Sequence, residues 1–464
     1  MSVLLKNGRI ITAAQSFTAD LLIEDGKIAA LGQGLHFKAD ECMDVSGKLI
    51  FPGFIDAHTH LDMETAVTRT ADDFASGTQA ALLGGTTTII DFATQDRGHT
   101  LKEAFSVWQK KAEHKSACDY AFHMAITDWN PQTRAEMKDM QELGVSSYKL
   151  YMAYDNLRLR DDVIFDIMLE IKRQHAMLGV HCENGDLVNG LIRRQLRQGH
   201  TAPLYHPLSR PAEVEAEAVD RYLTLASLAD LPVNIVHLST ALSLEKVRAA
   251  RSKGQIVFVE TCPQYLLLDD RLYAGTQADP FGGARYVCSP PLRSLSDQQA
   301  LWQGLIDGEI DTVSTDHCSF NYHGQKELGS NDFSQIPNGL PGIEHRPSLM
   351  YTAGVATGRI SPERLAALLA ENIAKQFGLY PQKGAIQPGS DADLVIWQPE
   401  DEGIIRAATQ RQQVDYTPYE GFKTKGRVSD VYLRGQAVVR QGKLKTSNAG
   451  RYVSRGPASY RRPL

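Results

Sequence analysis

Residues 51–63 read FPGFIDAHTHLDM and contain the feature around which the rest of the chain is organised. The apolar run Phe54-Ile55-Asp56 is typical of a buried strand, and His58-Thr59-His60 follows it closely. Side chains at positions i and i+2 of a strand point to the same side, so both imidazoles can face one interior space. We therefore expect a strand that ends in a pair of converging histidines.

Seven further short apolar runs follow the first, separated by longer amphipathic stretches. The expected strands are 54–56, 87–90, 120–124, 145–150, 177–180, 233–236, 256–259 and 311–314. Helical patterns lie between several of them, at 101–114, 163–175, 212–228 and 243–252. Strand–helix alternation repeated eight times implies an α/β fold with a parallel sheet closed into a (β/α)8 TIM-like barrel. We expect this barrel to span residues 53–380.

The two ends of the chain have a different pattern, that of short strands joined by tight turns. The expected turns are Asn7-Gly8, Asp25-Gly26, Pro388-Gly389 and Gly435-Gln436. We expect residues 1–52 and 381–464 to combine into one β-sandwich beside the barrel. The last stretch, 451–464, is expected to form an extended, solvated or interface-lying arm.

Composition argues against several classes of protein. The 464-residue chain has a formal net charge of −6, unlike nucleic-acid binders that rely on electrostatic attraction. No apolar run approaches the roughly 18 residues that a membrane helix needs. The six cysteines lie at least 26 residues apart and form no C-x-x-C pair, which suits reduced thiols. We expect a cytoplasmic protein without a nucleic-acid or membrane partner.

Side chains that can bind metal stand at the carboxyl ends of five of the expected strands. They are His58, His60, Lys149, His181, His237 and Asp316. A lone histidine after a strand is more often a hydrogen-bonded core residue, and a lone lysine is more often an ion-pair partner or a snorkelling side chain. Active sites of barrels lie at the carboxyl ends of the strands, so the six together favour a metal site. Imidazoles and a carboxylate suit zinc or another first-row divalent ion.

Several motifs resemble those of the amidohydrolase superfamily, and most closely those of its D-hydantoinase and dihydropyrimidinase family. They are FPGFIDAHTHLDM (51–63), GVSSYKLYMAY (144–154), GVHCEN (179–184), IVHLS (235–239), ETCPQYLLLD (260–269), CSPPLR (288–293), STDHCSF (314–320), IPNGLPGIEHR (336–346) and QKGAIQPGSDADLVIW (382–397). The resemblance covers nearly the whole chain. It implies an enzyme that opens a small cyclic amide, a 5-substituted hydantoin or a dihydropyrimidine, to an N-carbamoyl amino acid.

The same resemblance implies two divalent metal ions, with zinc expected and manganese or cobalt as alternatives. The first would be held by His58, His60, Lys149 and Asp316, and the second by Lys149, His181 and His237. Nearby positive charge lowers the pKa of a lysine and frees its amine. In relatives that amine takes up CO₂ to become a carbamate, so we expect Lys149 to be N6-carboxylated and to bridge both ions.

Roles in catalysis and substrate binding follow from the resemblance as well. Asp316 would carry a proton from the metal-bridging hydroxide to the leaving ring nitrogen. Tyr154 would stabilise the developing oxyanion, and Ser289 and Asn338 would hold the cyclic imide, largely through backbone groups. Relatives are commonly homotetramers or dimers, so a homo-oligomer is expected.

Other activities of the superfamily fit the residues less well. Dihydroorotases typically carry Arg after the His-x-His motif, and allantoinases an Asn-Glu-Pro-Gly type of sequence, whereas this chain reads LDMETAV at 61–67. Non-catalytic scaffold relatives lack the metal ligands, which are all competent residue types here. Deaminases of this architecture generally use one metal and have no bridging lysine, so Lys149 argues against deamination. The sequence does not distinguish hydantoin from dihydropyrimidine rings.

Overall fold

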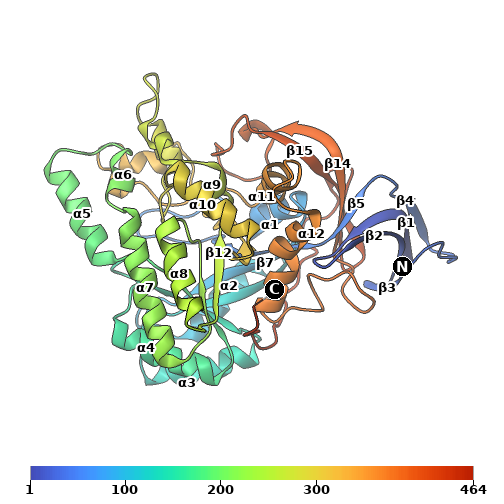
Figure 1. Ribbon diagram of the computed structural model, residues 1–464, viewed down its shortest axis with the longest axis horizontal. Coiled ribbons are helices and arrows are strands. Elements are labelled where there is room, and N and C mark those ends of the chain that lie inside the picture. The colour runs from blue at the N-terminus through green and yellow to red at the C-terminus, as the bar shows by residue number, and fades with distance from the viewer. Residues whose placement is uncertain (1, 463–464) are drawn as a thin grey trace.

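A computed structural model describes residues 2–462 of the chain. Figure 1 shows a barrel wrapped by helices, with a second sheet beside it that combines the blue N-terminal strands and the orange-to-red C-terminal strands. The expected fold class, a (β/α)8 barrel with a β-domain built from both chain ends, is confirmed. The boundaries at 53 and 380 stay a prediction. No helix within residues 2–462 is both long and apolar enough to span a bilayer.

The barrel strands are parallel and follow one another in chain order. They are β6 (Phe54–Thr59), β7 (Thr86–Thr94), β8 (Asp119–Ala125), β9 (Ser147–Tyr151), β10 (Met177–His181), β11 (Val233–Ile235), β12 (Val257–Thr261) and β13 (Thr312–Val313). All eight lie where the sequence predicts strands, and nearly all of their residues are buried. A cavity in the barrel interior beside Lys149 holds about 10 Å³, room for about one water, so the barrel is a packed core.

Residues near His317, rather than a regular ladder, close the barrel between its last and first strands. The backbone N–H of His60 donates to the carbonyl of His317 at 2.8 Å. The Thr315 hydroxyl donates to the carboxylate of Asp56 at 2.7 Å, across 259 residues of sequence. This closure brings the segment that carries Asp316 next to the histidine pair of β6.

Helices cover the outside of the barrel. They are α1 (Phe74–Leu83), α2 (Leu101–Ala112), α3 (Pro131–Glu142), α4 (Asp161–Arg173), α5 (Gly185–Arg197), α6 (Tyr205–Leu208), α7 (Ala212–Ala229), α8 (Ala241–Ser252), α9 (Pro263–Leu267), α10 (Leu295–Ile306), α11 (Arg346–Met350), α12 (Pro362–Ala366) and α13 (Asn372–Gln376). Two π-helical stretches, Tyr351–Val355 and Ala367–Glu371, extend α11 and connect α12 to α13. Capping boxes fix the starts of α1, at Asp73, and of α2, at Thr100.

The second sheet has nine strands drawn from both ends of the chain. They are β1 (Ser2–Ile11), β2 (Ser16–Glu24), β3 (Lys27–Gly32), β4 (Glu41–Asp44), β5 (Leu49–Pro52), β14 (Leu394–Ile404), β15 (Lys423–Leu433), β16 (Gln436–Arg440) and β17 (Lys443–Leu444). The two halves join where β5 pairs antiparallel with β14. The expected sandwich is thus one hydrogen-bonded sheet, and side chains from both halves, including Leu21, Ile50 and Ile396, form its own core.

Some expected turns differ in the structure. Asp25-Gly26 makes the β2–β3 hairpin, but Asn7-Gly8 lies in a bulge inside β1, so the hairpin predicted there is wrong. Asn7 has a φ of 62°, and its N–H donates to Asp20 Oδ1 at 2.9 Å, so a side chain of β2 satisfies the amide at the bulge. The β15–β16 turn is Arg434-Gly435, one residue earlier than expected, and Pro388-Gly389 has no strand before it.

The C-terminal arm packs across the amino-terminal end of the barrel. Tyr120 of β8 donates its N–H to the carbonyl of Arg451 and accepts the N–H of Val453, at 2.9 and 2.8 Å. Arg455 is buried and donates to the Ser147 hydroxyl at 2.8 Å. Val453 and Arg455 thus lie buried against the barrel, whereas Arg451, Ser454, Gly456 and Pro457 are exposed, and the interface-lying arm stays a prediction.

Candidate metal centre and active site

The barrel strands carry the six predicted ligand residues toward one end of the fold. His58 and His60 stand at the end of β6, Lys149 lies in β9, His181 ends β10, and His237 and Asp316 follow β11 and β13. His237 has a φ of 39° and Asp316 a φ of 53°. Non-glycine residues rarely adopt this left-handed conformation, and those that do are concentrated at functional sites.

Four imidazoles and one carboxylate converge on a common centre. Asp316 Oδ1 lies 3.2 Å from Nε2 of His58 and 3.2 Å from Nε2 of His60. His181 Nδ1 lies 3.0 Å from His237 Nε2. One donor atom each of His58, His237 and Asp316 fall within 4.8 Å of one another. Metal–ligand bonds of about 2.0–2.2 Å can join donors with this spacing through a shared ion.

Two glutamates contact the ring nitrogens of His58 and His181 that face away from the common centre. His58 Nδ1 lies 2.7 Å from Glu260 Oε1, and His181 Nε2 lies 2.7 Å from Glu183 Oε2. Such contacts fix the tautomer of an imidazole and aim its other nitrogen at the metal. Sequence reasoning missed both residues. Glu260 lies near the end of β12, so the strand-end argument that found the histidines could have found it too.

Lys149 is fully buried beside the histidine pair. Its Nζ lies 4.8 Å from the centroid of the Phe92 ring, which itself lies 4.6 Å from the His58 ring and 5.0 Å from the His60 ring. Burial lowers the pKa of Lys149 to about 8, although the negative charge of Asp316 opposes the shift. At pH 7 a larger share of Lys149 is therefore the neutral amine than in an ordinary lysine, and a reaction at its nitrogen requires that form.

The donor set fits divalent metal ions. His58 Nε2 is buried and has no hydrogen-bond partner in the described part of the chain. Burial lowers the pKa values of His58 and His237 well below the usual range, so both imidazoles are neutral, as metal binding requires. Neutral imidazoles with one carboxylate suit zinc and its neighbours. That these six residues bind metal stays a prediction.

Tyr154 stands beside this centre. The centroid of the Tyr154 ring lies 5.1 Å from the centroid of the His181 ring and 5.7 Å from the Arg210 guanidinium. Burial raises the pKa of Tyr154 to about 12, although Arg210 opposes the shift, so the phenol keeps its proton and can donate it in a hydrogen bond. The Ser289 hydroxyl is also buried, and it lies beside the Tyr154 phenol.

Asn338 belongs to a segment tied to both neighbouring loops. Its carbonyl faces the Cys318 sulfur at 3.8 Å, two residues beyond Asp316. The N–H of Gly339 donates to the carbonyl of Val287 at 3.0 Å, two residues before Ser289. The structure therefore brings the Ser289 and Asn338 segments together, while their substrate-binding roles stay predictions.

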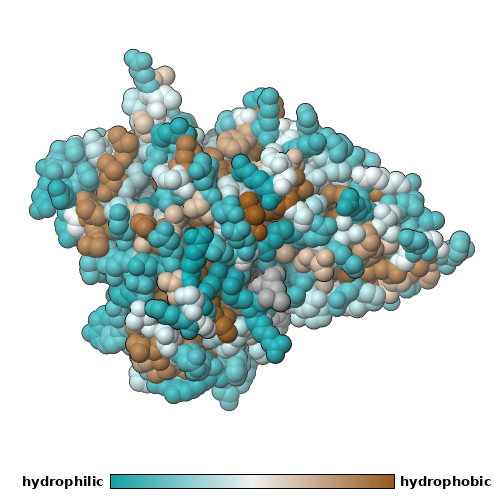
Figure 2. Space-filling model, in the orientation of Figure 1, coloured by the Kyte–Doolittle hydropathy of each residue, from teal (hydrophilic) through white to brown (hydrophobic). Residues whose placement is uncertain are grey.

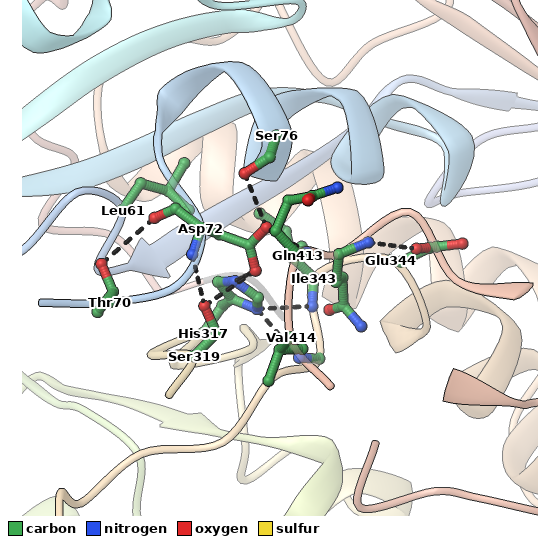
Figure 3. Close-up of polar contacts among 12 residues, drawn as sticks. Leu61, Thr70, Asp72, Ser76, His317, Ser319, Ile343, Glu344, Gln413 and Val414 are labelled. Carbon is green, nitrogen blue, oxygen red and sulfur yellow. Dashed lines mark hydrogen bonds and ion pairs between the residues drawn. The ribbon is translucent and has the colours of Figure 1, made fainter. Parts of the chain in front are cut away.

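A buried pair, Asp72 and His317, supports the segment that carries Asp316 (Figure 3). His317 Nε2 lies 3.2 Å from Asp72 Oδ2, and His317 Nδ1 accepts the N–H of Ile343 at 3.3 Å. The N–H of Gly342 also reaches His317 Nδ1, at 3.1 Å. Three further donors reach the Asp72 carboxylate: Ser76, Ser319 and the backbone of Gln413. Both ring nitrogens of His317 are engaged, so this histidine has none left for a metal ion.

Known proteins match this chain over nearly its whole length. The sequence model of the Amidohydrolase family matches residues 49–438. The chain belongs to the amidohydrolase family. This amidohydrolase is 45% identical to a D-hydantoinase of Geobacillus stearothermophilus, with 98% of this chain and 97% of the relative covered.

Two further comparisons agree with the first. The amidohydrolase is 42% identical to a D-phenylhydantoinase of Escherichia coli O81, with 98% of this chain and 99% of that one covered. It superimposes on the crystal structure of a dihydropyrimidinase from Brevibacillus agri with a TM-score of 0.97, at 41% identity and with all of both chains covered. The predicted membership of the hydantoinase and dihydropyrimidinase family is thereby confirmed, and the chain is an enzyme.

Proposed function

We propose that this amidohydrolase opens a cyclic amide, converting 5-substituted hydantoins or dihydropyrimidines to N-carbamoyl amino acids. The observation that carries the proposal is the convergence of four imidazoles, Asp316 and a buried lysine beside Tyr154. The similarity to proteins named D-hydantoinase and dihydropyrimidinase supports it. Amide hydrolysis needs an activated water, a polarised carbonyl and a proton for the leaving nitrogen.

The proposed cofactors are two divalent metal ions, with zinc expected and manganese or cobalt as alternatives. One would be held by His58, His60 and Asp316, the other by His181 and His237, and Lys149 would join both. When bound, the ions lower the pKa of a water molecule and polarise the substrate carbonyl.

Lys149 would take part as a carbamate, because an ammonium group cannot donate an electron pair to a metal. Burial already lowers its pKa to about 8. The neutral amine would add to the carbon of CO₂ and release one proton to water, which leaves a carboxylate at the end of the side chain. Both of its oxygens are then available as ligands.

Asp316 is the proposed proton shuttle. Its Oδ1 lies 3.2 Å from Nε2 of His58 and 3.2 Å from Nε2 of His60, at the centre of the site. The carboxylate would accept a proton from the attacking water and deliver it to the ring nitrogen as the amide bond breaks. Tyr154 would donate a hydrogen bond to the reacting carbonyl oxygen, and Ser289 and Asn338 would hold the imide edge of the ring.

A homo-oligomer, a tetramer or a dimer, in a reducing cytoplasm is also proposed. All six cysteines are free thiols. Figure 2 shows apolar patches on a mainly hydrophilic face, and the exposed apolar side chains include Leu187, Leu204 and Leu208. Light scattering of the purified protein tests the oligomer: the mass of two or four chains is expected, and the mass of one chain would contradict it.

One experiment tests the activity. Metal-loaded protein is assayed against hydantoin, 5-phenylhydantoin, dihydrouracil, allantoin and dihydroorotate. We expect turnover of one or more of the first three, because Asp62 beyond the histidine pair is acidic and repels the carboxylate of dihydroorotate. Turnover of allantoin and dihydroorotate alone would overturn the proposed substrate class.

A further inference from the structure

Lys326 is a completely buried lysine whose partners are all backbone carbonyls. Its Nζ donates to the carbonyl oxygens of Val287 at 2.7 Å, Pro337 at 2.8 Å and Gly339 at 2.8 Å. An ammonium group has three N–H donors, so each is used. The described contacts of its Nζ include no carboxylate, and burial lowers its pKa. Burying a charged group costs free energy unless its donors are satisfied, and here the three carbonyl oxygens satisfy them.

The three carbonyls belong to the two segments assigned to substrate binding. Val287 lies two residues before Ser289, and Pro337 and Gly339 flank Asn338. A 3.0 Å hydrogen bond from Gly339 N–H to the Val287 carbonyl also links these segments, within the same junction. Lys326 therefore sits where the two segments meet and contacts both.

Holding these three carbonyls also fixes the N–H groups in the same peptide planes, which are those of Cys288, Asn338 and Leu340. The Ser289 N–H lies in the next peptide plane, whose Cys288 carbonyl lies 2.8 Å from the ring Nε2 of His206. In a planar trans peptide the C=O and the N–H point in opposite directions, so a Pro337 carbonyl turned toward Lys326 turns the Asn338 N–H away from it. That N–H donates to no backbone carbonyl in the described chain, and the Ser289 N–H donates to none either. Both amides thus remain available for a ligand.

We propose that Lys326 is a positioning residue that holds the backbone of Ser289 and Asn338 in the geometry that binds the substrate ring. The inference rests on the proposed function, since it concerns the substrate of that same site. It assigns Lys326 no contact with the reacting atoms and no role in holding metal. It therefore predicts an effect on substrate affinity that is separate from metal loading and from the chemical step.

The test compares Lys326→Met, which keeps the length of the side chain but removes its donors, with Lys326→Gln, which keeps two donors at shorter reach. Ile171→Val, in the buried core of α4, controls for a general loss of stability. Hydrogen–deuterium exchange is followed in peptides 287–292 and 336–342, and KM, kcat and metal content are measured for a panel substrate. For Lys326→Met we expect exchange in both peptides to quicken and KM to rise about tenfold, with kcat within about threefold of wild type.

The other variants and the metal content complete the comparison. Lys326→Gln should lie between wild type and Lys326→Met in both readouts, Ile171→Val should match wild type, and all should bind the same amount of metal. A folded Lys326→Met protein with unchanged exchange, with unchanged KM, or with a loss confined to kcat overturns the proposal. Should Lys326→Met fail to fold, unchanged exchange and KM in Lys326→Gln overturn it instead.

A failure of the proposed function would look different. Wild-type protein that turns over no panel substrate removes that function, whereas the exchange readout needs no substrate and still decides whether Lys326 orders the two segments. Faster exchange only in Lys326→Met and Lys326→Gln supports the positioning role, and equal exchange in all variants rejects it.

Discussion

Glu260 Oε1 lies 2.7 Å from Nδ1 of His58 and 3.1 Å from the backbone nitrogen of His237, so one carboxylate orients two candidate metal ligands. Contacts of this kind set the direction and basicity of a coordinating imidazole. We expect Glu260→Gln to lower metal affinity about 10–100-fold without unfolding the chain. A chelator competition titration measures this, with Glu142→Gln, an exposed glutamate of α3, as the control. Equal affinities in the two variants would show that Glu260 does not support the site.

Tyr154 gives the second prediction. Since burial raises its pKa to about 12, its phenol is a hydrogen-bond donor throughout the neutral range. Removal of one donor to a developing oxyanion typically costs about 10²–10³ in kcat. We expect a loss of that size in Tyr154→Phe, with metal content unchanged, and no loss in Tyr380→Phe, whose side chain is exposed. Retention of wild-type kcat in Tyr154→Phe would remove Tyr154 from the mechanism.

Lys383 gives a prediction about stability. Its buried Nζ lies 2.6 Å from Asp119 at the start of β8, and 3.0 and 2.7 Å from Asp391 and Asp393 beside the second sheet. Although burial opposes them, these carboxylates raise the pKa of Lys383 above its ordinary value of 10.5. A lysine whose pKa is higher in the folded chain than in the unfolded chain stabilises the fold fully at any pH below the unfolded-state pKa. The stabilisation is lost only as the pH rises through the folded-state pKa, so it is complete at pH 7.

Breaking this cluster leaves buried carboxylates without a cation. We expect Lys383→Met to lower the free energy of unfolding at pH 7 by about 3–5 kcal/mol, as measured by urea denaturation. Lys375→Met, which breaks an i,i+4 surface pair with Glu371, should cost no more than about 0.5 kcal/mol. Similar losses of unfolding free energy in the two variants would mean that the Lys383 cluster does not stabilise the contact between the barrel and the second sheet.

The cysteines should differ sharply in reactivity. Burial raises the pKa of the Cys288 thiol to about 12 and also raises the pKa values of Cys118, Cys182, Cys262 and Cys318, whereas Cys42 is exposed. The thiolate is the reactive form, so a disulfide reagent at pH 8 should modify one thiol in the native protein and six after denaturation. Rapid modification of a Cys42→Ser variant would contradict this ordering.

Sequence alone located the barrel strands and the six candidate ligands for a physical reason. A buried parallel strand is a short apolar run in the sequence, and the carboxyl ends of all the barrel strands meet at one end of the barrel. His181 and His237 could therefore be assigned to one site without knowledge of the distance between their side chains. The helices 101–114 and 212–228 were likewise predicted close to α2 and α7, because their apolar spacing follows one face.

The rest depends on contacts between segments far apart in the chain. Nothing local to Arg455 or Val453 indicates that β8 accepts the C-terminal arm, and nothing beside Asn7 shows that Asp20 will satisfy its amide. Lys326 resembles any surface lysine in sequence, and only the fold brings three carbonyls to it. The hydrophobic pattern of a sequence indicates which residues are buried, but it does not indicate which buried polar groups form hydrogen bonds with one another.

Metal analysis of wild type and Lys149→Ala tests whether the proposed carboxylated Lys149 is needed to hold the proposed pair of metal ions. Protein purified with zinc and bicarbonate is dialysed and its metal is counted by mass spectrometry. We expect about two ions per chain in wild type and loss of the pair in Lys149→Ala, partly restored together with activity by short carboxylic acids. Two tightly bound ions and full activity in Lys149→Ala would contradict it.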